Sequence, residues 1–72
     1  MSAVPRVVAI AGEMIRLGQL LKLAGLADSG AEARALIQEG AVQVNGEIET
    51  RRGRQLHRGD LVGAADETVR VA

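Results

Sequence analysis

The densest group of cationic side chains in this sequence lies between Thr50 and Gly59, a segment without an acidic residue. It holds Arg51, Arg52, Arg54, His57 and Arg58. Cations neutralise the phosphates of a nucleic acid backbone, and a planar guanidinium group can donate two hydrogen bonds to one phosphate. The segment therefore indicates a phosphate-binding surface, with Arg51, Arg52 and Arg54 as first candidates and Arg58 as a further one. The alternative interpretation is a solvated loop whose arginines pair with Glu47 and Glu49.

Two more cations are candidates for the same surface. Lys22 falls outside the apolar stripe of one expected helix, and Arg34 falls on the first turns of a second. Both residues are therefore placed to flank one groove between the helices. The alternatives are an ordinary solvated Lys22 and a local pairing of Arg34 with Glu32 or Gln38.

The residue types argue against catalysis and against a metal or cofactor site. The chain has no cysteine, which removes disulfides, thiolate ligands and cysteine nucleophiles together. His57 is its single histidine, whereas a zinc site needs several such ligands. Asp60 follows Gly59 in a turn pattern, and no glycine-rich phosphate-binding motif occurs. We therefore expect no enzyme activity, no metal, no cofactor and no small-molecule substrate.

Composition limits the class of partner and the compartment. The 72 residues suffice for one domain, and the chain has no Phe, Tyr or Trp. Without aromatic side chains, binding of single strands by base stacking is disfavoured and folded RNA is favoured. No segment approaches the roughly 18 apolar residues of a membrane span. Together with the lack of cysteine, this favours a cytoplasmic protein that does not bind membranes. We also expect the protein to be a monomer.

Two short helices are expected in the first half of the chain. Each shows residues at offsets of three, four and seven that form one face of a helix. The two sets are Leu17, Leu20, Leu21 and Ala24, then Ala33, Leu36, Ile37 and Gly40. Gly25 and Gly40 are placed to end the helices, and Ser29 with Glu32 forms a capping-box pattern at the second helix start.

A small, mostly antiparallel sheet is expected in the second half. Residues 42–44 alternate as in a half-buried strand, and Asn45-Gly46 is typical of a two-residue hairpin turn. The returning segment 47–49 is expected to turn Ile48 inward and both glutamates outward. Further strands are expected at 61–62 and 69–71.

The order of these elements predicts an α+β fold, in which two short packed helices are followed by a small, mostly antiparallel sheet. Residues 13–72 are expected to form the domain, beginning with an extended stretch up to Leu17. Residues 1–12 are expected to be an N-terminal arm or an edge strand, because they contain the short apolar run 7–11.

The ordered combination of these segments resembles one known family. Residues 17–40 resemble the helical half of the RNA-binding domain named after protein four of the small ribosomal subunit, also called the S-four domain or alpha-L motif. Residues 41–47 resemble its hairpin, and 59–62 its closing turn and strand, so that the match spans 14–63. The runs 29–34 and 49–54 resemble small stand-alone bacterial members. Two positions depart from the family pattern. Gly18 stands where an acidic residue is common, and Gly30 stands where a basic residue is common.

The resemblance implies binding of folded RNA, of the ribosomal or transfer RNA class, by the helix pair and an adjoining loop. Together with the arginine-rich segment, it predicts non-catalytic binding of structured RNA through a basic face. A protein-interaction module is an alternative, since the formal net charge is zero. An accessory domain of an RNA-modifying enzyme is another. Binding that weakens steeply with salt distinguishes nucleic acid from protein as the partner.

Overall fold

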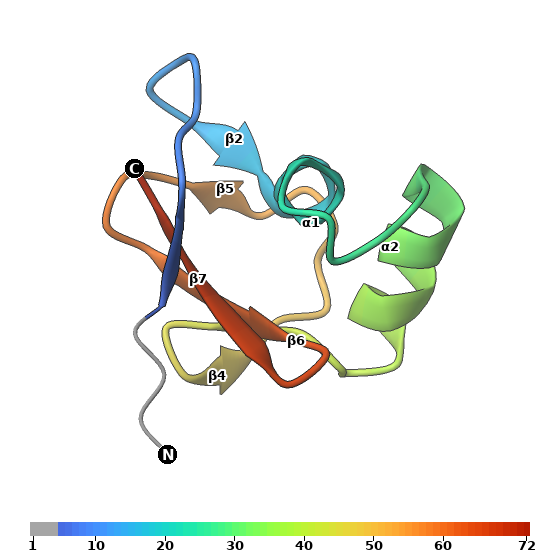
Figure 1. The fold of residues 1–72 in the computed structure, drawn as a ribbon. Coiled ribbons are helices and arrows are strands. Elements are labelled where there is room, and N and C mark those ends of the chain that lie inside the picture. Colours follow the sequence, from blue (N-terminus) through green and yellow to red (C-terminus); the bar gives the residue numbers. More distant parts are fainter. Residues whose placement is uncertain (1–4) are drawn as a thin grey trace.

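The computed structural model describes residues 5–72, and this part of the chain folds into two helices and seven short strands (Figure 1). The helices are α1 (Leu17–Leu23) and α2 (Gly30–Gln38). The strands are β1 (Arg6–Val8), β2 (Ile15–Arg16), β3 (Gln43–Val44), β4 (Glu47–Ile48), β5 (Gln55–Leu56), β6 (Leu61–Ala64) and β7 (Glu67–Val71). The predicted α+β class is confirmed, with the addition that two short strands precede the helices. None of the helices in this part of the chain is long and apolar enough to cross a lipid bilayer.

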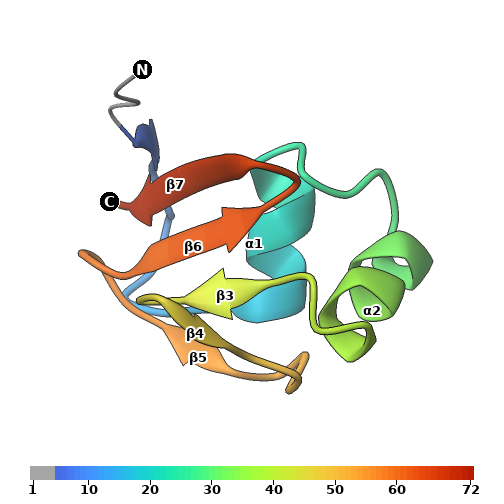
Figure 2. The ribbon, with the colours of Figure 1, turned by 90° about the horizontal axis from the view of Figure 1, so that it is seen from below.

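Five strands form the main sheet in the order β1-β7-β6-β3-β4, while β2 and β5 form a separate two-stranded ladder. Neighbours in the main sheet run antiparallel, except that β1 pairs in parallel with β7. Figure 2 shows β7, β6 and β3 side by side, with α1 crossing behind them. Within the N-terminal segment 1–12, residues 6–8 form an edge strand, while residues 1–4 lie outside the described residues.

The edge strand β1 is tied both to β7 and to the end of α1. The Arg6 Nε donates to the Glu67 carboxylate at 3.1 Å, and its Nη2 donates to the Ala24 carbonyl. Beyond the strand, the Ile10 amide donates to the Ala72 carbonyl at 2.8 Å. These contacts bring residues from the two ends of the described chain into one layer.

Local signals in the sequence determine where the helices begin and end. Gly25 and Gly40, which follow α1 and α2, have φ angles of +76° and +78°, a region that favours glycine. The Ser29 Oγ caps α2 by accepting a hydrogen bond from the Glu32 amide at 3.1 Å. The Glu32 side chain instead accepts from the Asp28 amide, one residue earlier than the capping box predicts. The expected helices are therefore confirmed, with this one change at the cap.

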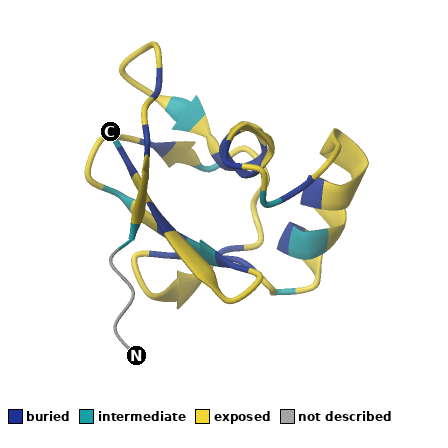
Figure 3. Ribbon diagram, in the orientation of Figure 1, coloured by how far each residue is buried: buried dark blue, intermediate teal, exposed yellow. Residues whose placement is uncertain are grey.

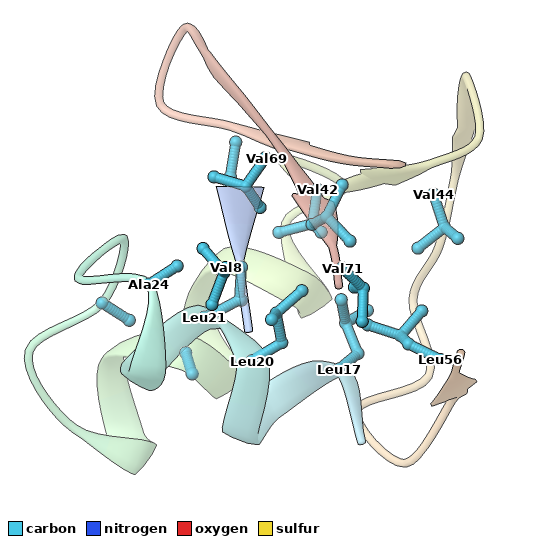
Figure 4. Close-up of a cluster of buried hydrophobic side chains, with 14 of the residues drawn as sticks. Val8, Leu17, Leu20, Leu21, Ala24, Val42, Val44, Leu56, Val69 and Val71 are labelled. Atoms are coloured by element: carbon cyan, nitrogen blue, oxygen red, sulfur yellow. The ribbon is translucent and has the colours of Figure 1, made fainter. Parts of the chain in front are cut away.

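The hydrophobic core lies between the helix pair and the inner face of the main sheet (Figure 4). Leu17, Leu20 and Leu21 of α1 are fully buried, as their spacing predicts. The opposing side is built from five valines in or directly before strands of the main sheet, and from Leu56 of β5; the valines are Val42, Val44, Val62, Val69 and Val71. Figure 3 shows buried residues turned toward this interior and exposed residues along the outer side of the helices. The core is thus aliphatic throughout, and burial of this apolar surface stabilises the fold.

The hairpin between β3 and β4 corrects one prediction. Asn45 and Gly46 have φ angles of +52° and +87°, as the expected two-residue turn requires. This turn pairs Gln43 with Ile48. Since paired residues share a face of the sheet, Ile48 lies outward beside the exposed Gln43 and is 63% exposed. The inward orientation expected for Ile48 is therefore wrong, and Glu49, which was expected outside, is 7% exposed.

Candidate functional site

A groove with a volume of about 570 Å³ runs between α1, α2 and the loop 51–54, here called the arginine loop. Its lining residues are Arg16, Gly18, Gln19, Lys22, Gly30, Ala31, Ala33, Arg34, Arg52 and Gly53. Four of these side chains are cations, and no carboxylate lines the groove. We call this surface the cation groove. An excess of positive charge without a paired acid suits it to bind an anion.

The arginine loop is held against the start of α1 by backbone hydrogen bonds. The Leu17 amide donates to the Arg54 carbonyl at 2.9 Å, and the Gly18 amide donates to the Arg52 carbonyl at 3.1 Å. These amides belong to the first turn of a helix, where N–H groups have no partner within the helix. The loop therefore caps α1, and the same contacts place its side chains at the groove.

Gly18 allows the closest approach between the helix and the loop. A Cβ atom at this position would lie 2.9 Å from the Arg52 Cγ, closer than two carbon atoms can pack. The hydrocarbon part of Arg52 thus passes directly over the glycine. The departure of Gly18 from the family pattern makes room for a cation of the groove.

Glu49 organises the other two arginines of the loop. Its carboxylate accepts hydrogen bonds from Arg51 Nε and Nη2, at 3.0 and 3.1 Å, and from Arg54 Nη1 at 2.8 Å. It also accepts from the Arg51 backbone amide at 3.0 Å. These bonds, those from the Arg51 side chain first, hold the pKa of the Glu49 carboxyl well below its usual 4.5. Glu49 is therefore a charged, nearly buried anchor for both ends of the loop.

The structure separates the six predicted site residues into three groups. Lys22, Arg34 and Arg52 lie together in the cation groove. Arg51 and Arg54 pair with Glu49, as the solvated-loop alternative proposed, although Glu47 takes no part. Arg58 lies apart, where its Nη2 donates to the Ile10 carbonyl at 3.2 Å.

Sequence reasoning missed one cation of the groove, Arg16. It lies at the end of β2, opposite Gln55 of β5, and its Nη1 donates to the Gly53 carbonyl at 3.1 Å. No local pattern distinguishes Arg16, because its place depends on the pairing of β2 with a strand far along the chain. The Gly53 carbonyl that accepts from the Arg16 side chain carries no charge, so the cation remains available to a ligand.

Asp60 and His57 have structural roles. Asp60 accepts hydrogen bonds from the His57 amide at 2.8 Å and from the Asn45 side chain at 3.2 Å. These bonds join the turn before β6 to the β3–β4 hairpin, so Asp60 lies in a turn as its pattern predicts. Within residues 5–72, no group of three or more His, Cys, Asp or Glu side chains is arranged to hold a metal ion.

Comparison with known proteins gives a consistent result. Residues 8–72 match the family model described as the S4 domain. "Probable ribosome maturation protein RlbA" of Bacillus subtilis (strain 168) is 49% identical over 55 residues, which cover 76% of this chain and 78% of the relative. YbcJ of Escherichia coli (strain K12) is 42% identical over 57 residues, which cover 79% of this chain and 81% of the relative.

Several solved structures share the fold. The solution structure of YbcJ from E. coli superposes with a TM-score of 0.73 and 33% identity, covering 100% of this chain and 92% of that one. It is described as an alpha-L motif involved in RNA binding. The ribosomal protein S4e from Thermoplasma acidophilum superposes with a TM-score of 0.64 over 83% of this chain and 32% of that one. At 20% identity, the second likeness concerns the fold alone.

Proposed function

Because this chain belongs to the S4 domain family, we propose that it binds structured RNA without catalysing a reaction, and that the cation groove holds the RNA backbone. The observation that carries the proposal is the gathering of Arg16, Lys22, Arg34 and Arg52 in one groove that no carboxylate lines. The RNA-binding motif described for YbcJ and the name of RlbA support RNA of the ribosomal class or transfer RNA as the partner. The ribosome-related name of RlbA also supports action in the cytoplasm. That the protein acts as a monomer stays a prediction.

Arg52, Lys22 and Arg34 are the proposed primary phosphate contacts. None of the three makes a side-chain hydrogen bond or an ion pair with another residue of the range 5–72. Their charges are thus free to replace counterions on a phosphate backbone, which is the main source of affinity for nucleic acids. Arg16 adds a fourth contact.

Arg51, Arg54 and Arg58 have a less direct part in this proposal. Arg51 and Arg54 already donate to Glu49, which reduces their positive field while fixing the loop. We assign them mainly to positioning Arg52. Their remaining donors, and the exposed Arg58, reach RNA only where it extends beyond the groove.

The experiment is a salt titration of binding to one hairpin RNA. The test variant carries Lys22→Gln, Arg34→Gln and Arg52→Gln, and the control carries Arg70→Gln, another exposed arginine on the outer face of β7. The slope of log affinity against log salt should become shallower by about 0.7–0.9 for each lost phosphate contact. The control slope should stay close to that of the wild type. Equal slopes in the triple variant and the wild type would refute the proposed groove. If the wild type shows no salt-sensitive binding to the RNA, the alternative of a protein-interaction module would be favoured.

Structured RNA is proposed over single strands because the chain offers no aromatic platform for successive bases. In competition, poly-U should displace the protein from a hairpin RNA poorly. Equally effective displacement by poly-U would contradict the structured class while leaving backbone binding intact.

A gain of affinity provides an independent test. Gly30 lines the groove, and a Cβ atom added there would meet nothing within 4 Å. Gly30→Arg should therefore be accommodated, and it should tighten binding with a salt slope steeper by about 0.7–0.9. Weaker or unchanged binding would mean that RNA does not approach the start of α2.

A further inference from the structure

A second hollow, of about 670 Å³, adjoins the cation groove on the other side of α1. Its walls are largely apolar and include Ile10, Met14, Ile15 and Leu23. Met14 is 37% exposed and Leu23 is 55% exposed, so this surface presents two large apolar side chains to solvent. Exposed apolar side chains that line one hollow can mark a binding site. We call this surface the apolar hollow.

The apolar hollow and the cation groove are continuous. Gln19 and Lys22 line both of them. These residues are three positions apart on α1, so they lie on the same face of the helix and form a shared rim. A ligand whose phosphate lies beside Lys22 can therefore place an attached group into the hollow.

We propose that the apolar hollow takes the base of one unpaired nucleotide in the RNA whose backbone occupies the cation groove. This inference rests on the proposed function and adds a requirement on the RNA. Folded RNA exposes unstacked bases in bulges and loops, and proteins hold such bases between apolar or aromatic side chains. In a chain without aromatic residues, Met14 and Leu23 offer the exposed apolar faces next to the phosphate contacts.

The largely apolar walls of the hollow suit the flat face of a base better than a strongly polar ligand. No carboxylate lines it, so a neighbouring phosphate is not repelled. The carboxamide of Gln19 offers both a donor and an acceptor at the rim, which can pair with the edge of a base. Lys22 supplies the charge for the phosphate that joins this nucleotide to the next.

The experiment compares three hairpin RNAs with the same stem. One carries a single bulged adenosine, one carries an abasic ribose at the bulge, and one is fully paired. The wild-type protein should bind the bulged adenosine RNA at least about fivefold more tightly than the abasic RNA, because the base would bury apolar surface against the hollow. The abasic RNA keeps the phosphate and the bulge, so this ratio reports on the base alone.

Leu23→Ser and Met14→Ser should each bring this ratio close to one and leave the salt slope unchanged. Ile48→Ser is the matched control, because Ile48 is an exposed apolar residue at the far edge of the main sheet. It should retain the full ratio. Using two test variants ensures that partial unfolding of one does not decide the result, and circular dichroism verifies the fold of each.

The outcomes separate this inference from the proposed function. Equal affinity of the wild type for the adenosine and abasic RNAs would overturn the base site, as would a ratio that survives in both variants. Salt-sensitive binding in those cases leaves backbone binding in the cation groove standing. A wild type that binds none of the three RNAs in a salt-sensitive manner would overturn both proposals.

Discussion

Glu49 shows how a single residue can decide which cations are available to a ligand. Its carboxylate occupies the guanidinium groups of Arg51 and Arg54, whereas Arg52, between them in sequence, turns to the cation groove. The carboxylate is nearly buried, and every hydrogen bond it accepts comes from these two arginines. The charges of Arg51 and Arg54, at the two ends of the arginine loop, are therefore neutralised by Glu49, and the charge of Arg52 between them is free.

The lowered pKa of Glu49 predicts a loss of stability in acid. A carboxyl whose pKa is lower in the folded state stabilises the fold above its unfolded value, here about 4.5, and this contribution is lost as pH falls below that value. Asp60 acts in the same direction: burial raises its pKa, but the hydrogen bonds from the His57 amide and the Asn45 side chain outweigh this and lower it. The midpoint of urea unfolding should therefore fall as pH decreases from about 5 to about 3.

The matched variant is Glu49→Gln. It should be less stable than the wild type at neutral pH, because the charge-assisted hydrogen bonds are lost. It should also show a flatter dependence on pH below 4.5, since the lowered pKa of Glu49 no longer contributes and that of Asp60 still does. Parallel pH profiles for the two proteins would show that Glu49 does not carry the acid sensitivity.

At the scale of elements, the start of α1 and the arginine loop form one unit. The loop carbonyls of Arg52 and Arg54 complete the hydrogen bonds of the first turn, and Gly18 admits the Arg52 side chain. Helix capping and ligand-site geometry thus depend on the same contacts. A change that displaces the Arg52 side chain but keeps these backbone hydrogen bonds should therefore affect binding more than folding.

Gly18→Ala tests this junction. The added methyl group displaces Arg52, while alanine favours the helix over glycine by about 0.5–1 kcal/mol. We expect little change in the unfolding free energy but a weakening of RNA binding by about threefold to tenfold, comparable to the loss of one phosphate contact. Gly30→Ala is the control, because its Cβ would meet no atom within 4 Å, and it should leave binding unchanged. Equal affinities for the two variants would contradict the role of Gly18.

The hairpin between β6 and β7 contains a different kind of constraint. Its two-residue turn places Ala65 and Asp66 at φ angles of +54° and +62°, although neither is glycine. A left-handed conformation costs an L-residue about 1–2 kcal/mol, and Asn-Gly accommodates it better. Ala65→Asn combined with Asp66→Gly should therefore raise the unfolding free energy by about 1 kcal/mol, measured in urea. A decrease would show that Ala65 or Asp66 is needed for its side chain.

A contrasting change belongs in the hairpin that already has Asn-Gly. Gly46→Val should lower the unfolding free energy by about 1–3 kcal/mol, because a β-branched residue resists the positive φ at that position. An unchanged melting curve would contradict the turn assignment.

These elements also show how far the sequence can be used for prediction. Apolar spacing and glycine positions predicted both helices, and Asn45-Gly46 predicted the turn. The same turn determines that Ile48 pairs with Gln43 and faces outward. The inward orientation predicted for Ile48 was wrong because alternation within one strand does not give the register with its partner. The pairing of Glu49 with Arg51 and Arg54 was among the alternatives, but nothing in composition could select it.

At the scale of the whole molecule, a formal net charge of zero coexists with a strongly basic groove. Two acids pair with arginines outside the groove: Glu49 with Arg51 and Arg54, and Glu67 with Arg6 at the β1–β7 edge of the main sheet. Local patterns could not predict this separation, because both the position of Arg16 and that of β1 depend on pairing with distant segments. The family resemblance predicted the fold but not which cations share the groove.

The parallel pairing of β1 with β7 has a consequence for the order of assembly. Arg6 aligns with Val69 and Val8 with Val71, so this ladder joins segments separated by almost the whole chain. Closing so long a loop is entropically unfavourable, whereas the hairpins and the helix pair form from neighbouring segments. We therefore expect β1 to dock last during folding and to detach first from the native state. In native-state hydrogen exchange, the Ala72 amide, which donates to Val8, should exchange faster than the Val71 amide, which donates to Asp60 within the β5–β7 region. Equal protection of the two amides would mean instead that β1 unfolds together with the rest of the domain.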